Sequence, residues 1–90
     1  MKVTLDTVLR KNPNAAYRIF DGQATIVLPD HSEVSVLNEL GSQVWERIDG
    51  SRTVGQIVES VLQEYEVGPE TARQDVLEFI GALHDHGMVT

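Results

Sequence analysis

A single change of hydrophobic period divides this sequence into two blocks. From Ala15 to Leu37, apolar and polar residues alternate over short runs, which is the period of a β-strand. From Asn38 onward, apolar residues recur every three or four positions, which is the period of an amphipathic helix. No internal repeat or second domain is visible. The order of the blocks predicts an α+β domain, winged helix-turn-helix-like, with the elements β-β-β-α-α-α.

Two short strands are predicted on either side of Asp21-Gly22, the strongest two-residue signal for a β-hairpin. Residues 15–20 are rich in β-branched and aromatic side chains, and residues 23–28 alternate. The second run places Ala24, Ile26 and Leu28 on one face. These two runs therefore predict an antiparallel hairpin with one apolar face.

A third strand is expected at residues 33–37, after a turn at Pro29-Asp30-His31-Ser32. Alternation places Val34 and Val36 on one face, where we expect them to contribute to the core of the sheet. The opposite face holds Glu33, Ser35 and Leu37. The expected product is a three-stranded antiparallel meander in which the third strand is an edge.

Three helices are predicted in the second block from their start and stop signals. Asn38 is an N-cap for the first helix, which ends at Asp49-Gly50. The second helix opens with a capping box of Thr53 and Gln56. Pro69 suits the first turn of the third helix, which ends at the glycine at position 87. Trp45 is expected to anchor the first helix in the core.

Residues 1–13 are predicted to form a flexible N-terminal arm, and residues 14–90 the folded domain. Asn12-Pro13-Asn14 ends any regular element in the arm. No apolar run reaches signal-peptide length or the ~20 residues of a membrane span. The sequence contains no cysteine, which excludes disulfides and zinc–thiolate sites. We therefore expect a cytoplasmic protein without a membrane partner.

The distribution of charge argues against a nucleic-acid partner. Seven Lys and Arg residues stand against 14 Asp and Glu residues, and the net charge is −7. Between Thr53 and Thr90 the only basic side chain is Arg73. The acids of this stretch are Glu59, Glu64, Glu66, Glu70, Asp75, Glu78 and Asp85. Such a surface repels nucleic acid and anionic lipid.

No pattern in the sequence predicts a catalytic or metal site. His84 and His86 are two positions apart, so they lie about 200° from each other on a helix. His31 falls in a predicted turn far away in the sequence, so the three histidines do not suggest one metal ion. No serine lies in a nucleophile motif, and the glycines do not have the spacing of a phosphate loop. We expect a protein that is not an enzyme and has no cofactor.

A set of ordered segments resembles a known family. The first segments are Tyr17…Phe20-Asp21-Gly22, Val36-Leu37-Asn38-Glu39-Leu40-Gly41 and Val44-Trp45…Ile48-Asp49-Gly50. The later ones are Arg52-Thr53-Val54…Ile57-Val58, Tyr65-Glu66-Val67, Glu70-Thr71-Ala72…Asp75-Val76…Phe79-Ile80 and Leu83…Gly87-Met88-Val89. Together they resemble the PqqD family, also called the RiPP precursor peptide recognition element, and the generic PqqD-like branch in particular.

The resemblance implies a peptide chaperone. Members of the family bind the leader part of a ribosomally made precursor peptide and present it to a modifying enzyme, often a radical SAM enzyme. The resemblance also implies that the leader adds as a strand beside the third strand and lies against the third helix. Such a protein serves peptide modification, including cofactor biosynthesis.

The residues themselves allow this mechanism. The predicted edge strand Glu33-Val34-Ser35-Val36-Leu37 contains neither Lys nor Pro, so its backbone is open to a further strand. On the third helix Arg73, Leu77 and His84 lie about 60–100° to one side of Val76, with Ile80 at the border. We expect these residues to form the other wall, with Arg73 meeting an acidic residue of the peptide. Alternatively, Leu77 widens the core stripe while Arg73 and His84 are solvated.

Two other functions remain open from sequence alone. The order of the elements also suits a nucleic-acid-binding winged-helix regulator, although the charge disfavours it. The third possibility is a small regulatory or structural partner of a larger enzyme. An open strand edge is compatible with a monomer or with a weak or domain-swapped dimer.

Overall fold

The computed structural model describes residues 2–28 and 33–90 and has the predicted order of elements. The strands are β1 (Ala16–Phe20), β2 (Gln23–Leu28) and β3 (Glu33–Val36), and the helices are α1 (Glu39–Arg47), α2 (Val54–Glu64) and α3 (Pro69–Asp85). The strands form one antiparallel sheet in the order β1-β2-β3. The turn expected at residues 29–32, which includes His31, lies outside the described residues. The predicted α+β fold is confirmed.

The hairpin between β1 and β2 turns at the predicted place. Asp21 and Gly22 both have positive φ, 55° and 79°, as a type I′ turn requires at its two central residues. The predicted inner face of β2 is also confirmed, because Ala24, Ile26 and Leu28 are buried. The hairpin is therefore fixed by its turn and by one buried row of side chains.

The prediction for the faces of β3 was wrong. Val34 and Val36 are 65% and 66% exposed, whereas Leu37, immediately after the strand, is 7% exposed. The register explains the difference, because Val34 lies opposite the exposed Val27, and Ser35 lies opposite the buried Ile26. Val34 and Val36 therefore face away from the core, and Leu37 enters it.

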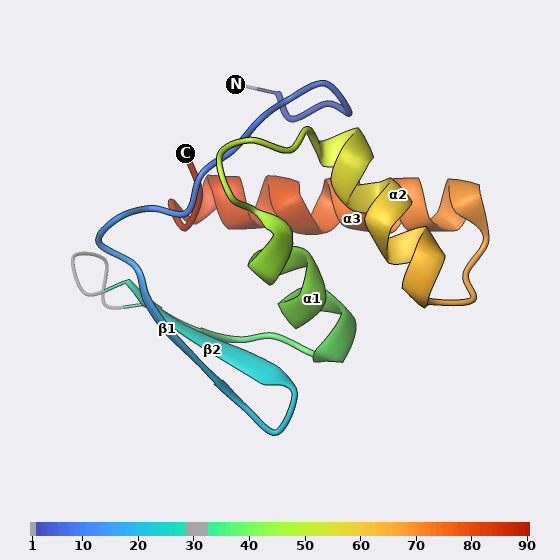
Figure 1. The fold of residues 1–90 in the computed structure, drawn as a ribbon. Coiled ribbons are helices and arrows are strands. Elements are labelled where there is room, and N and C mark those ends of the chain that lie inside the picture. Colours follow the sequence, from blue (N-terminus) through green and yellow to red (C-terminus); the bar gives the residue numbers. More distant parts are fainter. Residues whose placement is uncertain (1, 29–32) are drawn as a thin grey trace.

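The helices cover one face of the sheet in two layers. Figure 1 shows α1 between the sheet and α3, with α2 beside α3. Residue contacts join α1 to β2 and to α2, and α2 to α3. Trp45 of α1 is completely buried, and its ring meets that of Tyr17 edge-on, with 5.4 Å between the ring centres. The prediction that Trp45 anchors α1 is confirmed.

The predicted helix starts are also confirmed. The side-chain oxygen of Asn38 accepts a 2.7 Å hydrogen bond from the backbone N–H of Gly41 at the start of α1. Thr53 and Gln56 form the capping box of α2, with hydrogen bonds of 3.1 and 2.8 Å. Pro69 occupies the first turn of α3. Side-chain caps thus mark the starts of α1 and α2, and a proline marks the start of α3.

The N-terminal segment, residues 2–13, runs between the start of α2 and the C-terminal residues. The carbonyl oxygens of Thr7 and Leu5 accept hydrogen bonds of 2.9 and 2.8 Å from the first N–H groups of α2. Arg10 and Thr90 exchange two backbone hydrogen bonds, of 3.1 and 2.8 Å. Leu9 is 3% exposed and belongs to the core. The flexibility of residues 1–13 in solution stays a prediction.

Lys11 holds the same segment against β1 and α1. Its Nζ donates a 2.7 Å hydrogen bond to the carbonyl oxygen of Ile48 and lies 5.6 and 5.3 Å from the ring centres of Tyr17 and Trp45. Burial lowers the pKa of Lys11 below 10.5, although Glu46 and Asp49 oppose the shift. In place of part of its hydration, the ammonium group of Lys11 therefore contacts the carbonyl oxygen of Ile48 and the rings of Tyr17 and Trp45.

Candidate functional site

The backbone of β3 has one open edge. The N–H of Leu37 donates a 2.8 Å hydrogen bond to the carbonyl oxygen of Ala24, so the polar groups of Leu37 point toward β2. In an antiparallel strand this direction alternates from residue to residue, so Ser35 also faces β2 while Val34 and Val36 face outward. Among the described residues, β2 is the only strand that pairs with β3. The N–H and C=O groups of Val34 and Val36 are thus available to another strand.

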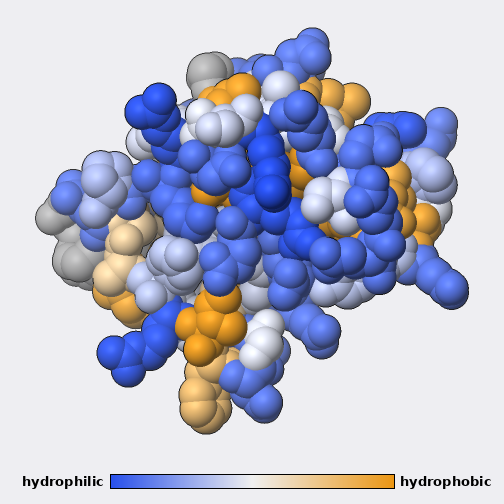
Figure 2. Space-filling model, viewed as in Figure 1, coloured by the Kyte–Doolittle hydropathy of each residue, from blue (hydrophilic) through white to orange (hydrophobic). Residues whose placement is uncertain are grey.

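The face of the sheet that points away from the helices exposes several large apolar side chains, beside the polar Arg18, Gln23 and Thr25 of the same face. We call Phe20, Val27, Val34 and Val36 the outer face; their exposed fractions are 81%, 37%, 65% and 66%. In Figure 2 apolar surface gathers at the hairpin end of the sheet, at the bottom of the view. The uncovered face of an antiparallel sheet is commonly polar. An exposed apolar face beside an open edge is typical of an interaction surface.

A small pocket lies between α1 and α3, beginning two residues after the end of β3. Its volume is about 200 Å³. Its lining residues are Asn38, Leu40, Gly41 and Val44 from the start of α1, and Asp75, Val76 and Phe79 from α3. Most of these side chains are apolar, and the two polar ones are the exposed Asn38 and Asp75. The pocket can therefore hold an apolar group next to a carboxylate.

Gly41 leaves room for the aromatic wall of this pocket. A Cβ at this position would lie 3.2 Å from Cζ of Phe79 and 3.0 Å from Oδ1 of Asn38. Both distances are shorter than ordinary van der Waals contacts. The absence of a side chain at Gly41 lets the ring of Phe79 approach the backbone of α1.

The two polar side chains of the pocket differ in their hydrogen-bond partners. Oδ1 of Asn38 is engaged by the N–H of Gly41. Asp75 makes no hydrogen bond or ion pair with any residue that the structure describes. Glu39, next to Asn38 in the first turn of α1, adds a second exposed carboxylate nearby along the chain. The one charged side chain among the described residues that line the pocket is therefore the carboxylate of Asp75.

The sequence matches the family described as coenzyme PQQ synthesis protein D (PqqD) over residues 24–89. The chain belongs to the PqqD family. The matched segment includes β2 except for Gln23, β3 and all three helices, and leaves β1 and the N-terminal segment outside. The family predicted from the sequence is therefore confirmed. A comparison with curated proteins finds no match.

Three solved structures share the fold of this PqqD-family domain. TbiB1 in complex with the TbiA(beta) leader peptide has 19% identity and a TM-score of 0.82, covering 89% of this chain and 93% of that one. Lasso peptide synthetase B1 complexed with the leader peptide has 19% identity and a TM-score of 0.82, covering 93% and 99%.

The third is the solution structure of the PqqD truncation of Methylobacterium extorquens PqqCD, described as a functional and stand-alone RiPP recognition element. It has 20% identity and a TM-score of 0.79, covering 98% of this chain and 94% of that one. At these identities the likeness establishes a common fold for the PqqD-family domain.

The site residues predicted on α3 do not line the pocket. At about 100° per residue, Phe79 and Asp75 lie about 60° and 100° to one side of Val76, whereas Arg73 and Leu77 lie on the other side. His84 lies on the same side as Arg73, with its Nδ1 4.0 Å from Oδ1 of Asp85. Ile80 is completely buried in the core. Contact of a ligand with Arg73, Leu77, Ile80 and His84 stays a prediction.

On β3 the structure brings together part of the predicted set. Val34, Ser35 and Val36 lie in the strand with Glu33, and the open backbone groups belong to Val34 and Val36. Leu37 is buried against β2 and α1 and is therefore a core residue. The predicted edge strand is present, but only Val34 and Val36 turn their backbone groups to its open side, which is fewer residues than the five expected.

Sequence reasoning assigned none of the seven described pocket residues to the site: Asn38, Leu40, Gly41, Val44, Asp75, Val76 and Phe79. Asn38 was explained by capping, and Phe79 was named only within the segments that resemble the family. The short distance between Gly41 and Phe79 depends on how α1 crosses α3, which hydrophobic periodicity does not report. One residue could have indicated this pocket from the sequence: Asp75 is a charged residue about 100° around α3 from Val76.

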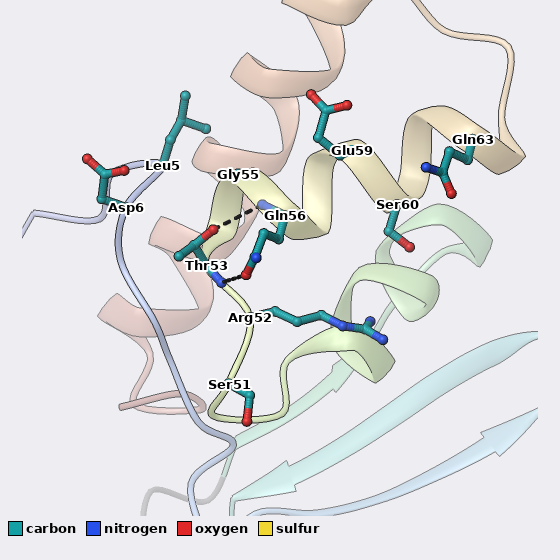
Figure 3. Close-up of a pocket in the computed structure, with 10 residues that line it drawn as sticks. All are labelled: Leu5, Asp6, Ser51, Arg52, Thr53, Gly55, Gln56, Glu59, Ser60 and Gln63. Atoms are coloured by element: carbon teal, nitrogen blue, oxygen red, sulfur yellow. Dashed lines mark hydrogen bonds between the residues drawn. The ribbon is translucent and has the colours of Figure 1, made fainter.

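A second hollow lies between the N-terminal segment and α2, and Figure 3 shows its mainly polar lining. The start of a helix can bind an anion through its free N–H groups. Here those groups are occupied, because Val54 and Gly55 donate to the carbonyl oxygens of Thr7 and Leu5, and Gln56 donates to Oγ1 of Thr53. This hollow therefore offers no backbone donors to a ligand.

Residues 2–28 and 33–90 contain no group of three side chains positioned to hold a metal ion. Within the same residues, no helix is both long and apolar enough to cross a membrane.

Proposed function

We propose that this PqqD-family domain binds the leader of a ribosomally made precursor peptide and presents it to a modifying enzyme without catalysing the modification. The observation that carries the proposal is the open edge at Val34 and Val36, in the strand that leads at Asn38 into the lining of the pocket between α1 and α3. Backbone pairing at such an edge supplies affinity, and pockets for alternate side chains supply specificity.

The comparisons support this proposal through the partners of the similar structures. TbiB1 and lasso peptide synthetase B1 were each solved with a leader peptide, and the PqqD truncation is described as a recognition element. The shared fold gives the present chain the same three strands and three helices around its open edge. The proposed ligand is therefore an extended peptide that becomes a fourth strand next to β3.

The proposed enzyme partner is a radical SAM protein, following the family resemblance. Exposed acidic side chains on α2 and α3 would favour a basic docking patch on that enzyme and accelerate association. Nucleic acid is a poor alternative, because the net charge is −7 and the phosphate backbone needs cations. The proposal is for a cytoplasmic monomer whose free edge also permits a weak dimer.

The test is an NMR titration of labelled protein with the synthetic leader peptide of a candidate precursor. Val34→Pro removes an outward N–H, places a ring on the open edge and leaves the bonds of Ser35 and Leu37 to β2. We expect it to weaken binding at least about fivefold. Val34→Thr keeps the N–H and shape, and its affinity should stay within about twofold of wild type.

The same titration shows which side of α3 meets the peptide. Shifts at Asp75 and Phe79 place it over the pocket, whereas shifts at Arg73, Leu77 and His84 place it on the flank predicted from sequence. An Arg73→Ala variant with unchanged Kd argues against the latter. If Val34→Pro folds and binds as well as Val34→Thr, strand addition at β3 is wrong.

A further inference from the structure

We infer that the pocket between α1 and α3 selects a peptide with an apolar side chain two positions from a Lys or Arg, with Asp75 as the specificity-determining residue. This inference rests on the proposed function and adds to it the chemistry of the ligand. It reverses the charge expected from the sequence, where Arg73 was paired with an acidic residue of the peptide.

The size of the pocket favours one side chain. Its volume of about 200 Å³ is smaller than the ~300–1,000 Å³ typical of small-molecule sites. Val44, Val76 and Phe79 contribute apolar walls, and Val44 and Val76 are almost completely buried. An aliphatic side chain of a docked peptide would lose its contact with water there.

The charge at the pocket favours a cation. Asp75 lines the pocket, is exposed and has no partner among the described residues. The nearest cation along α3, Arg73, is two positions away and therefore about 200° around the helix. The Asp75 carboxylate is thus free to pair with a basic side chain of the ligand.

The geometry of a strand sets the spacing of the two side chains. Successive side chains of an added strand point to opposite faces, and residues two apart lie about 7 Å from each other on the same face. The apolar anchor and the cation must both point toward α3 to meet the pocket and Asp75. The intervening residue then points to the side of the outer face, beside Val34 and Val36.

The experiment is a selection from a displayed library of random 12-residue peptides on the intact protein and on Asp75→Asn and Asp75→Lys variants. Glu78→Gln is the matched control, because Glu78 is an exposed acid about 200° from Val76 on α3. Wild type and Glu78→Gln should enrich a basic residue two positions from an apolar one. Asp75→Asn should lose this preference, and Asp75→Lys should enrich an acidic residue there.

Binding of synthetic peptides from the selection then tests directly whether Asp75 pairs with the basic residue of the peptide. We expect Asp75→Asn to weaken binding of the basic peptide by about two- to fivefold and not to change binding of its Lys→Gln version. NMR shifts at Val34 and Val36 report whether the peptides add to β3.

Selected peptides that shift β3 but show no basic preference, or keep it in Asp75→Lys, overturn this inference and leave the proposed function standing. A library with no enriched peptide, or peptides that leave β3 unshifted, overturns the proposed function and this inference with it.

Discussion

The side-chain hydroxyl of Ser42 accepts a 2.7 Å hydrogen bond from the backbone N–H of Ala24. The carbonyl oxygen of Ala24 accepts from the N–H of Leu37, the residue opposite it just beyond the end of β3. In an uninterrupted ladder the N–H of Ala24 would return a bond to Leu37. The hydroxyl of Ser42 takes that place and joins α1 to the sheet where β3 ends.

Ser42→Ala should lower the free energy of unfolding by about 1–3 kcal/mol. The reason is that Ser42 is 1% exposed, so the N–H of Ala24 would lose its acceptor in a buried place. The measurement is urea unfolding followed by circular dichroism. Ser51→Ala, an exposed serine whose side chain accepts no described hydrogen bond, should change stability by less than about 0.5 kcal/mol. A Ser42→Ala protein as stable as Ser51→Ala would contradict this account.

The faces of β3 show what alternation can and cannot predict. In β2 the positions that alternate with Ala24, Ile26 and Leu28 include the polar Gln23 and Thr25, so the inner face of β2 followed from the sequence. In β3 both faces offer apolar residues, Val34 and Val36 on one and Leu37 on the other. Which face of β3 is buried is decided by its pairing with β2 and by the way the chain enters α1. Both are tertiary constraints.

The candidate site was predictable in its strand and not in its helix. The absence of Lys and Pro in the third strand indicated an open edge, and the structure leaves that edge unpaired among the described residues. The side of α3 that meets α1 depends on the crossing of two helices. Hydrophobic periodicity does not reveal the close approach of Phe79 to Gly41, which follows from that crossing.

Leu9→Ala should destabilise the protein by about 2–5 kcal/mol, as expected for a buried leucine. Leu9 is 3% exposed and joins the core from the N-terminal segment, whereas the adjacent Val8 is 44% exposed. Val8→Ala is therefore the matched control and should cost less than about 1 kcal/mol. Thermal unfolding compares the two variants.

Hydrogen exchange of the same segment tests the predicted flexible arm. Slow exchange at Arg10 and Asn12, whose N–H groups bond to the carbonyl oxygens of Thr90 and Met88, would contradict flexibility of residues 1–13. Equal stability of Leu9→Ala and Val8→Ala would instead contradict the packing of this segment in the core.

Asp49 should make stability depend on pH in the acid range. Its Oδ1 accepts hydrogen bonds of 2.9 and 3.0 Å from the N–H groups of Ser51 and Arg52, which lower the pKa of Asp49 below 3.8. A carboxyl group whose pKa is lower in the folded state than in the unfolded state stabilises the folded state. This stabilisation is complete at pH values above the pKa of the unfolded state and is lost as the pH falls through the pKa of the folded state.

Asp49→Asn keeps an acceptor oxygen and cannot titrate in this range. The stability advantage of wild type over Asp49→Asn should therefore shrink between about pH 5 and pH 2. Urea unfolding at a series of pH values measures it, with Glu59→Gln on α2 as the control carboxyl substitution. Parallel pH profiles for wild type and Asp49→Asn would show that these hydrogen bonds do not depend on the charge.

Gly41→Ala should impair peptide binding more than folding. The added Cβ would come within 3.2 Å of the Phe79 ring and push that ring from its position in the pocket wall. Alanine also gains up to about 1 kcal/mol of helix propensity over glycine, which offsets part of the strain in α1. We expect at least about a fivefold loss of affinity for a selected peptide, with a change in stability below about 1 kcal/mol. Gly81→Ala is the matched control, because a Cβ there would meet nothing within 4 Å. If Gly41→Ala folds and binds like Gly81→Ala, the pocket does not receive the peptide, and the anchor must lie elsewhere along β3.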